Sequence, residues 1–442
     1  MKPIAFGMLL WMLMAAPSPG ATVFPYKYHE ETLPNGLTVI VVPMESGGLV
    51  AYWSVVRTGS RDEVEPGKSG FAHFFEHMMF RGTKKYPGPV YDRIVTAMGA
   101  DANAYTTDDY TAYHLAFARE SLARVVEIES DRFQNLDYAE PAFQTEAGAV
   151  YGEYRKDVTQ PFFLLDEKLR DVAFDRHTYK HTTMGFEADV KAMPQAYAYS
   201  RSFFRRFYRP DNTVLVVAGD VEAKATLELV RKHYGAWERG YVPPKIVPEP
   251  PQKAERKAEV SYPGQTLPIL DVAYKGDALD PGNRDFVAGL ILGDLAFGST
   301  SVLYKDLVIR QQKVEFLTAS FPINRDPPLL EIVAMVKKVE DVRAVQEAID
   351  RTIGEFQARP TDAGKLEAVK RHHKYGFLMG LDSPDAVAGS VARFVALTGG
   401  LDVIDRLYGE MDKVTPQDVV RAARQYLQPQ RRTVVVLKGA QP

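Results

Sequence analysis

The first half of the chain alternates between strand-like and helix-like patterns of apolar and polar residues. Thr32–Val42 places an Asn35-Gly36 turn ahead of a run of β-branched residues, which is the pattern of a β-hairpin. Leu49–Arg57 predicts a further strand, and Ala100–Ala118 predicts two strands around Asp108-Asp109. Helical periodicity predicts helices over 120–135, 141–157, 161–173, 195–207 and 222–237, with a strand at 213–217 before the last of them.

The second half shows the same mixture. A strand-like segment covers 259–275, and helical periodicity follows over 281–296, 340–357, 362–379, 384–398 and 416–427. Strands and helices are mixed without a regular βαβ rhythm, so the sequence predicts an α+β fold. Residues 241–258 are rich in Pro, Lys and Glu and predict a linker. We therefore expect two domains, 22–240 and 259–442, on either side of it.

An internal repeat supports this division into two halves. Residues 204–220 and 422–439 each read as the end of a helix, a turn with Pro, and a β-branched closing strand. Val434 and Gly439 lie 220 positions after Val214 and Gly219. The alternative is that two ordinary helix–strand endings resemble each other by chance.

Composition narrows the function. The chain has 442 residues, 45% hydrophobic and 25% charged, which is typical of soluble globular proteins. Its net charge of −3 gives no reason to expect a nucleic-acid partner. It has no cysteine, which excludes disulfides, thiolate ligands and a cysteine nucleophile.

The N-terminus predicts a secretory signal. Lys2 is followed by an apolar run, Ile4–Ala16, that is short for a membrane span, and then by small residues up to Ala21. Residues 1–21 are therefore expected to be removed, leaving a periplasmic or secreted protein without stable membrane insertion. An uncleaved anchor is the alternative.

The chemistry centres on His73-Phe-Phe-Glu-His77. On a helix, residues four apart share a face, so His73 and His77 can bind one metal ion while Glu76 lies beside it. The surrounding residues are apolar, and buried imidazoles and carboxylates need partners, which a metal supplies. Ser69 is a candidate N-cap for this helix and Gly82 a candidate terminator. This spacing is the inversion of the His-Glu-x-x-His metalloprotease motif.

A hydrolytic zinc site needs a third protein ligand and an open position for water. The predicted helix over 141–157 carries Glu146 and Glu153, seven residues apart and so on one face. Composition alone does not choose between them. His177 and His181 also lie four apart, but the segment around them lacks an apolar helical pattern, so we do not expect metal there.

Several stretches together resemble the pitrilysin-type inverted zincins, the family of insulin-degrading enzyme and the mitochondrial processing peptidase. The resemblance covers the whole chain after residue 21 and is most specific in the first half. The stretches that carry it are 73–83, Asn103-Ala-Tyr-Thr106, Glu146 with Glu153, His181-Thr-Thr-Met-Gly185, and the weaker 301–307 and 414–419.

The resemblance implies a zinc metallopeptidase with one zinc ion per chain. In the family the third ligand lies about 76 positions after the second His, and the residue at that position here is Glu153. The resemblance also implies a supporting role for Glu146 next to a ligand. Glu76 would be the general base. Asn103 and Ala104 would lie on an edge strand that pairs with an extended peptide substrate. It also implies two homologous half-domains, each a largely antiparallel sheet covered by helices, that form a clam-like half-chamber.

The resemblance also raises the question of a partner. Many active members carry an Arg and a Tyr seven apart in the second half, just after a Ser-x-Leu-Tyr/Phe segment. In this chain Ser301-Val-Leu-Tyr304 places Val308 and Glu315 at those positions. Because neither side chain supplies those donors, we expect a heterodimer with a homologous subunit that lacks the metal site; a homodimer is the alternative. The competing function is a non-catalytic scaffold or assembly subunit, which typically loses part of the metal motif.

Overall fold

The computed structural model describes residues 22–440, so the predicted signal, 1–21, lies outside the described residues. The first half contains six strands. They are β1 (His29–Thr32), β2 (Thr38–Pro43), β3 (Leu49–Val56), β4 (Asp101–Thr106), β5 (Thr111–Ala118) and β6 (Thr213–Gly219). Its helices are α1 (Phe71–Met78), α2 (Gly88–Ala97), α3 (Leu122–Asn135), α4 (Glu140–Asp157), α5 (Pro161–Ala173), α6 (Glu187–Ala192), α7 (Tyr197–Phe207) and α8 (Ala223–Tyr234).

These strands form one mixed sheet in the order β1-β2-β6-β3-β5-β4. The predicted hairpin is β1–β2, with Gly36 at φ 90° in its turn, a conformation that favours glycine. Asn35 holds the turn because its side-chain amide donates to the carbonyls of Tyr234 and Trp237. Strand β4 is at the open end of the sheet, as an edge strand.

The second half has strands β7 (Arg256–Tyr262), β8 (Ile269–Lys275), β9 (Val314–Ser320), β10 (Leu329–Val336) and β11 (Arg432–Gly439). Its helices are α9 (Arg284–Phe297), α10 (Val302–Tyr304), α11 (Val342–Ala358), α12 (Ala363–Met379), α13 (Pro384–Thr398), α14 (Asp402–Asp412) and α15 (Pro416–Tyr426). A π-helical turn, Lys305–Arg310, continues α10.

The second sheet repeats the topology of the first. Its order is β7-β11-β8-β10-β9, with only the β7–β11 pair parallel. In the first sheet β2 and β6 are likewise parallel, and β6, β3, β5 and β4 then follow as antiparallel neighbours. The predicted repeat therefore corresponds to α7–β6 and α15–β11, each a helix that leads into a central strand. The protein is α+β, with two mixed sheets covered by helices.

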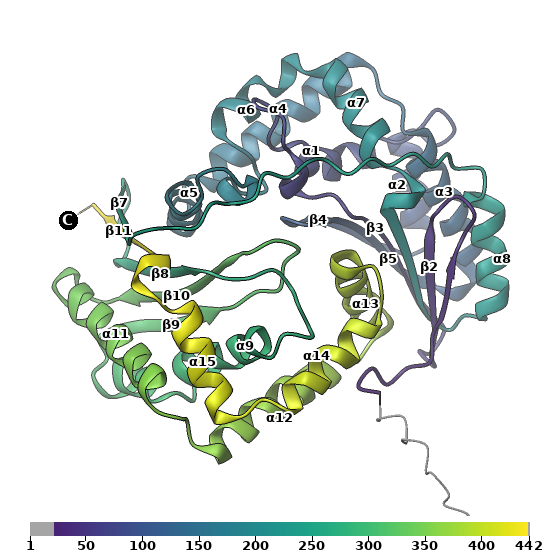
Figure 1. Ribbon diagram of the computed structural model, residues 1–442. Helices are drawn as coiled ribbons and strands as arrows, with labels where there is room; N and C mark the ends of the chain where they lie inside the picture. The colour runs from purple at the N-terminus through teal and green to yellow at the C-terminus, as the bar shows by residue number, and fades with distance from the viewer. Residues whose placement is uncertain (1–21, 441–442) are drawn as a thin grey trace, which may run out of the picture.

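The two halves exchange a helix. Helix α5, from the first half, packs on β7 and β11, whereas α13, from the second, packs on β3 and β6 (Figure 1). Trp53 on β3 donates its indole N–H to Asp385 at the start of α13 (2.8 Å). The sheets thus each bury one face under a helix of the other half.

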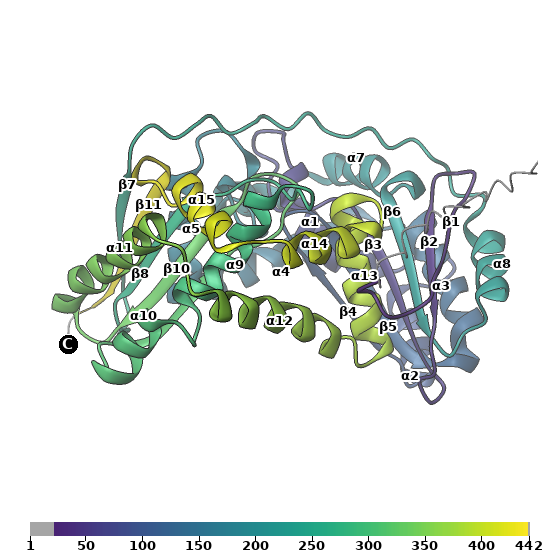
Figure 2. The ribbon, with the colours of Figure 1, turned by 60° about the horizontal axis from the view of Figure 1, so that its bottom comes forward.

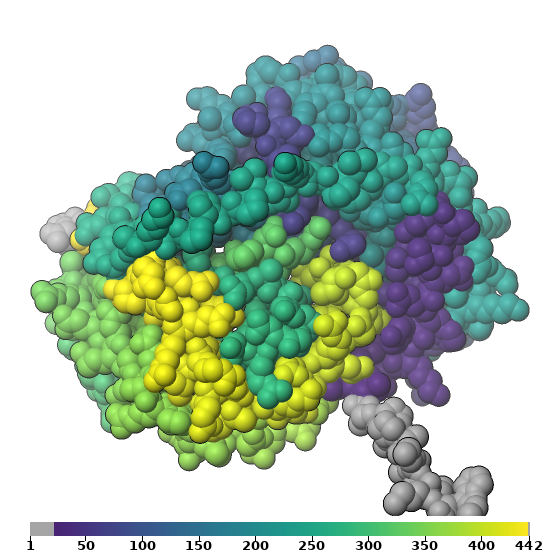
Figure 3. Space-filling model, in the orientation of Figure 1, coloured from purple at the N-terminus to yellow at the C-terminus, as the bar shows by residue number. Residues whose placement is uncertain are grey.

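A chain segment without helix or strand, about residues 238–255, crosses from the first half to β7 (Figure 2). In the space-filling view it lies along the surface where the two halves meet (Figure 3). The β9–β10 loop also joins the halves. The Arg325 backbone N–H donates to Asp109 (3.0 Å), and Asp326 pairs with Arg61 and His177.

The predicted elements need two corrections. The strand-like segment 259–275 is two strands, because residues 263–268 turn the chain between β7 and β8. Helices α2, α6 and α14 were not predicted, and neither were strands β9 and β10. Helix α9 and the segment up to Arg310 are long and apolar enough to cross a membrane, but 67% of that window is buried in the protein, as in a core helix.

Candidate metal centre

Helix α1 is anchored at its N-terminus by a buried carboxylate. Glu63 accepts the backbone N–H groups of Gly70 (2.7 Å) and Ala72 (2.6 Å), which are free donors of the first turn. The prediction that Ser69 caps this helix is wrong, because its hydroxyl donates to Asp189 instead. Gly70 takes φ 87°, and a Cβ there would lie 2.7 Å from the Met184 carbonyl oxygen.

The loop that carries His181-Thr-Thr-Met-Gly185 packs against this helix start. A Cβ on Gly185, which has φ 83°, would lie 2.6 Å from the Gly70 nitrogen. The two backbones therefore touch only because both residues are glycines. The loop has a structural role here, as it holds the first turn of α1 in place.

His73 and His77 lie on one face of α1, with their Nε2 atoms 3.3 Å apart. His73 is buried, and this burial, reinforced by the neighbouring His77, lowers the pKa of His73 to about 3. Other positions of α1 are apolar, and the side chains of Phe71, Phe74 and Phe75 are buried in the core. A neutral His73 is the form that binds metal.

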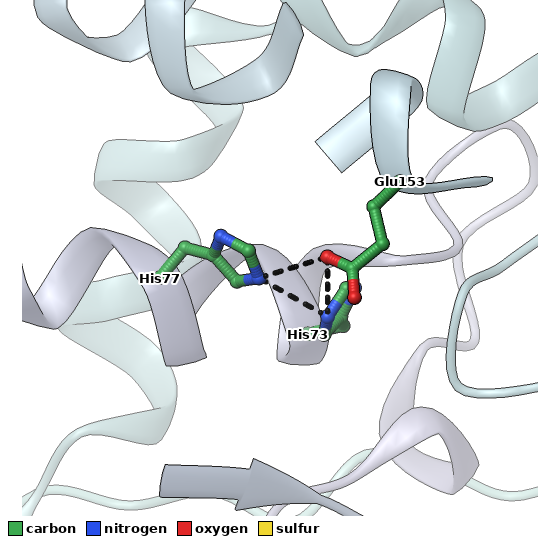
Figure 4. Close-up of side chains that lie close together, drawn as sticks. All are labelled: His73, His77 and Glu153. Atoms are coloured by element: carbon green, nitrogen blue, oxygen red, sulfur yellow. Dashed lines mark hydrogen bonds and ion pairs between the residues drawn. The ribbon is translucent and has the colours of Figure 1, made fainter. Parts of the chain in front are cut away.

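The third donor comes from α4. Glu153 Oε2 lies 3.3 Å from His77 Nε2 and 3.7 Å from His73 Nε2 (Figure 4). In a tetrahedral zinc site with ligand distances of about 2.1 Å, neighbouring ligand atoms are separated by roughly 3.4 Å. The three donor atoms therefore fit one zinc ion, and this is the only such group among residues 22–440.

Glu146 lies on the other side of the His77 ring. Its carboxylate accepts from His77 Nδ1 (3.1 Å) and from Arg81. This hydrogen bond is the main reason that the pKa of His77 is raised. Burial acts to raise the pKa of Glu146, but His77 and Arg81 outweigh it and lower that pKa. Because Nδ1 carries the donated proton, Nε2 is left with a lone pair that faces Glu153 and His73.

Glu76 lies next to the donor group without belonging to it. The Thr106 hydroxyl donates to Glu76 Oε2 (2.7 Å). Burial raises the pKa of Glu76, against the effect of this hydrogen bond. A carboxylate with a raised pKa, held beside a metal, is suited to accept and return a proton.

Strand β4 brings an unpaired backbone edge to the same place. The Thr107 N–H donates to the Tyr110 carbonyl (2.9 Å), so this pair of residues is hydrogen-bonded. In an antiparallel pair of strands, hydrogen-bonded and non-hydrogen-bonded residue pairs alternate, so the N–H groups of Ala104 and Thr106 point away from β5. The Asn103 side chain accepts the Ala104 N–H (2.9 Å). Helix α1 packs on β4, so this edge lies beside Glu76.

The other histidine pair, His177 and His181, makes separate contacts in the structure. His177 bonds Asp326 and caps a short turn, and His181 bonds the Thr182 carbonyl, as separate contacts. Sequence reasoning missed the roles of Glu63, Arg81 and Thr106. Arg81 and Thr106 lie within stretches that it singled out, but their contacts depend on packing between distant segments.

Comparison with known proteins matches both halves of the chain to models of one peptidase family. The profile described as Insulinase (Peptidase family M16) matches residues 39–187, and Peptidase M16 inactive domain matches 197–372. The chain is 28% identical to the zinc protease PqqE of Helicobacter pylori, over 93% of each chain. It is 25% identical to the mitochondrial-processing peptidase subunit beta of Lentinula edodes, over 90% of this chain and 86% of that one. A crystal structure of a protease from Helicobacter pylori superimposes with a TM-score of 0.88 at 27% identity, covering 93% of this chain and 99% of that one.

Proposed function

Because the chain belongs to the insulinase family, peptidase family M16, we propose that it is a zinc-dependent endopeptidase that cleaves extended or unfolded peptides. The observation that carries the proposal is the convergence of His73, His77 and Glu153 on one point, with Glu76 beside them. All four belong to the predicted set of catalytic and metal-binding residues. A scaffold protein would need no such convergence.

When bound by His73, His77 and Glu153, zinc supplies Lewis-acid activation of a water molecule and of the scissile carbonyl group. Glu76 accepts the proton from the attacking water at its carboxylate and returns it to the leaving amine. Thr106 holds one oxygen of Glu76 and so fixes the direction in which the other faces. Glu146 keeps the proton of His77 on Nδ1.

The edge of β4 orients the substrate. An extended peptide that adds to this edge would accept the outward N–H groups of the strand and run past Glu76. Asn103 must release the Ala104 N–H for this to occur. Since such pairing involves the backbone, it selects extended chains more than particular side chains.

The experiment measures cleavage of an unfolded peptide by the purified chain with its metal, after chelation, and after zinc is restored. Activity should follow zinc. Glu76→Gln should keep about one zinc per chain and lose roughly 100- to 10,000-fold in turnover, because an amide does not accept the proton. A Glu76→Gln protein with wild-type turnover would contradict the assignment, and a zinc-loaded wild type without activity on any peptide or with any partner would favour the scaffold.

We further propose that the chain works with a homologous subunit that lacks the metal site. Val308 is partly buried in the π-helical turn after α10, and Glu315 on β9 pairs with Lys337 (3.4 Å). Neither offers the donors expected opposite the metal. The isolated chain should bind zinc but turn over peptide slowly, and turnover per zinc should rise when such a subunit is co-expressed. Full activity of the isolated chain would exclude this proposal, and a homodimer would then be the simpler assembly.

For the location, we propose the periplasm or the exterior of the cell. The support is the N-terminal sequence, with Lys2, the apolar run Ile4–Ala16 and the small residues up to Ala21. N-terminal sequencing of the protein recovered from the periplasmic fraction tests this. A retained N-terminal Met1 on protein in the cytoplasm would contradict it.

A further inference from the structure

Two acidic side chains lie in the contact between helix α5 and the second sheet. Helix α5, from the first half, packs on β7, β8 and β11 (Figure 1). Most of this contact is apolar, and Ile269, Ala273 and Leu329 of the sheet belong to it. Asp271 stands between the first two of these on β8, and Glu331 follows two residues after Leu329 on β10. Because side chains alternate along a strand, both acids point to the face that α5 covers.

Strand pairing makes these two residues diagonal neighbours, and we call them the acidic pair. Asp271 is opposite Val333, and Glu331 is opposite Ala273, in the antiparallel pairing of β8 with β10. Diagonal neighbours in such a pair lie roughly 7–8 Å apart, within reach of a long side chain. The two carboxyl groups therefore share one small region under α5.

The acidic pair has no counter-charge of its own. Asp271 is 3% exposed, and its Oδ1 is buried without a donor among the described residues. The cation that acts on Glu331 is Arg170 of α5. The Arg170 guanidinium bonds Asp166 (2.9 and 3.1 Å) and Asp108 (3.1 and 3.2 Å) instead. An ionised carboxylate that is buried without a partner is costly, so the docked helix favours a protonated pair.

The other strands of the sheet do not supply the missing charge. The residues in line with Asp271 on β9 and β11 are Thr318 and Val435, which are uncharged. Lys275 on β8 and Arg256 on β7 lie on the same face, but near the C-terminal end of α5. There Lys275 lies over the ring of Phe174, and Arg256 donates to the carbonyls of residues 172 and 173. The groups near the acidic pair are thus two carboxylates and one guanidinium, a net negative charge.

Burial and these carboxylates keep the protons on the pair. Burial raises the pKa of Asp271 well above its ordinary value, and Glu331 and Asp166 act in the same direction. Burial also raises the pKa of Glu331 to about 7; Asp166 and Asp108 add to this effect, and Arg170 acts against it. Because the two groups interact, they titrate as a pair that loses its first proton near pH 7.

We propose that the acidic pair makes the docking of α5 sensitive to pH: the helix stays docked while the pair holds its protons, and it leaves the sheet more often once the pair ionises. The effect reaches the metal centre through α4, which carries Glu153 and leads into α5 after a short turn. The Tyr154 hydroxyl of α4 donates to Glu167 of α5 (2.9 Å). Opening of α5 therefore disturbs the helix that positions Glu153.

The direction of the pH effect follows from the protons bound in each state. A glutamate in water titrates near pH 4.3, whereas the docked Glu331 keeps its proton up to about pH 7. Over this range the docked state binds more protons than the open state, so docking weakens as the pH rises and is weakest above 7. From pH 6 to pH 8 the equilibrium constant for opening of α5 should rise roughly ten-fold.

The experiment measures amide hydrogen exchange of residues 161–173 in the zinc-loaded full chain at pH 6 and pH 8, corrected for the intrinsic pH dependence of exchange. The protection factor of α5 should fall roughly ten-fold between the two. In the double variant Asp271→Asn/Glu331→Gln, whose amides are neutral at both pH values, it should stay constant. Glu340→Gln, which changes an exposed glutamate after β10, should behave like the wild type. Equal wild-type protection at both pH values would overturn the proposal, and this comparison needs no variant to fold.

Zinc release tests the link to the metal centre. The rate of zinc transfer to a chelating dye is measured for the wild type and the double variant, and their ratio removes the pH dependence of the ligands themselves. This ratio should rise roughly two- to ten-fold from pH 6 to pH 8. A constant ratio would overturn the link to Glu153. The proposal rests on the metal site of the proposed function, but neither measurement involves peptide cleavage, so failure of this proposal and failure of the proposed peptidase activity are distinguishable.

Discussion

The two glutamates of α4 give the sharpest test of the metal centre, because they differ in position and not in chemistry. Glu153 Oε2 faces both Nε2 atoms, whereas Glu146 accepts from His77 Nδ1 on the far side of the ring. An imidazole binds the ion through one nitrogen, so Glu146 acts on the metal only through His77. Substituting each by alanine should therefore weaken zinc binding by different amounts.

The magnitudes follow from these contacts. A four-ligand zinc site contributes roughly 10–16 kcal/mol, which corresponds to about 2.5–4 kcal/mol for each ligand. Glu153→Ala should thus weaken zinc binding about 100- to 1,000-fold. Glu146→Ala should weaken it about 10- to 100-fold, since it removes the partner of a ligand. Glu146→Gln should cost less still, because its amide oxygen can still accept from Nδ1–H.

Competition with a zinc-binding dye measures these affinities. Glu140→Ala, an exposed glutamate on the same helix, is the matched control and should bind zinc like the wild type. If Glu146→Ala loses more affinity than Glu153→Ala, then Glu146 is the ligand and the arrangement of α4 against α1 described above is wrong.

Three further predictions follow from single contacts. Gly70→Ala places a Cβ against the Met184 carbonyl at φ 87° and should cost about 1–3 kcal/mol of unfolding free energy. Gly148→Ala on α4, where no atom lies within 4 Å of the added Cβ, should instead stabilise the protein by up to about 1 kcal/mol. Equal denaturation midpoints for the two variants would refute this prediction. Ala104→Pro removes an outward N–H of β4 and should raise KM about 2- to 12-fold at unchanged zinc content, and an unchanged KM would argue against pairing of the substrate with this edge. Burial acts to raise the pKa of Asp326, but His177 and Arg61 outweigh it and lower that pKa to about 2, so the stabilisation by Asp326 is present above pH 4 and is lost as pH falls through 2. The difference in unfolding free energy between wild type and Asp326→Asn should therefore shrink by about 2 kcal/mol between pH 5 and 2. A difference that stays constant over this range would refute the prediction.

Local patterns were enough to predict most of the elements and two of the three residues proposed to bind the metal, His73 and His77. The apolar period of α4 and the Asn35-Gly36 turn are properties of short segments, and the spacing of His73 and His77 fixes a shared helix face. The choice between Glu146 and Glu153 came from the family resemblance, and the distances to the two imidazoles agree with it.

What the sequence did not predict depends on contacts between distant segments. Ser69 satisfies the usual rule for an N-cap, but Glu63 takes that role because a turn brings its carboxylate under the first N–H groups of α1. Thr106 contacts Glu76 only because β4 pairs at the edge next to α1. Lys275 gives no sign in the sequence of being buried, since it ends an ordinary strand and is enclosed by the crossing segment.

The exchanged helices show why the half without metal ligands matters to the site. Only Val158–Gln160 separate α4, which carries Glu153, from α5, which packs on the second sheet. The direction in which α4 leaves the metal centre is therefore set in part by the docking of α5 on β7 and β11. In return, α13 covers the face of the first sheet opposite to α1, where Trp53 bonds Asp385. The first half alone would expose that apolar face and leave α5 without its sheet. The candidate metal site thus has its three proposed ligands on one half, while its geometry depends on the packing of both.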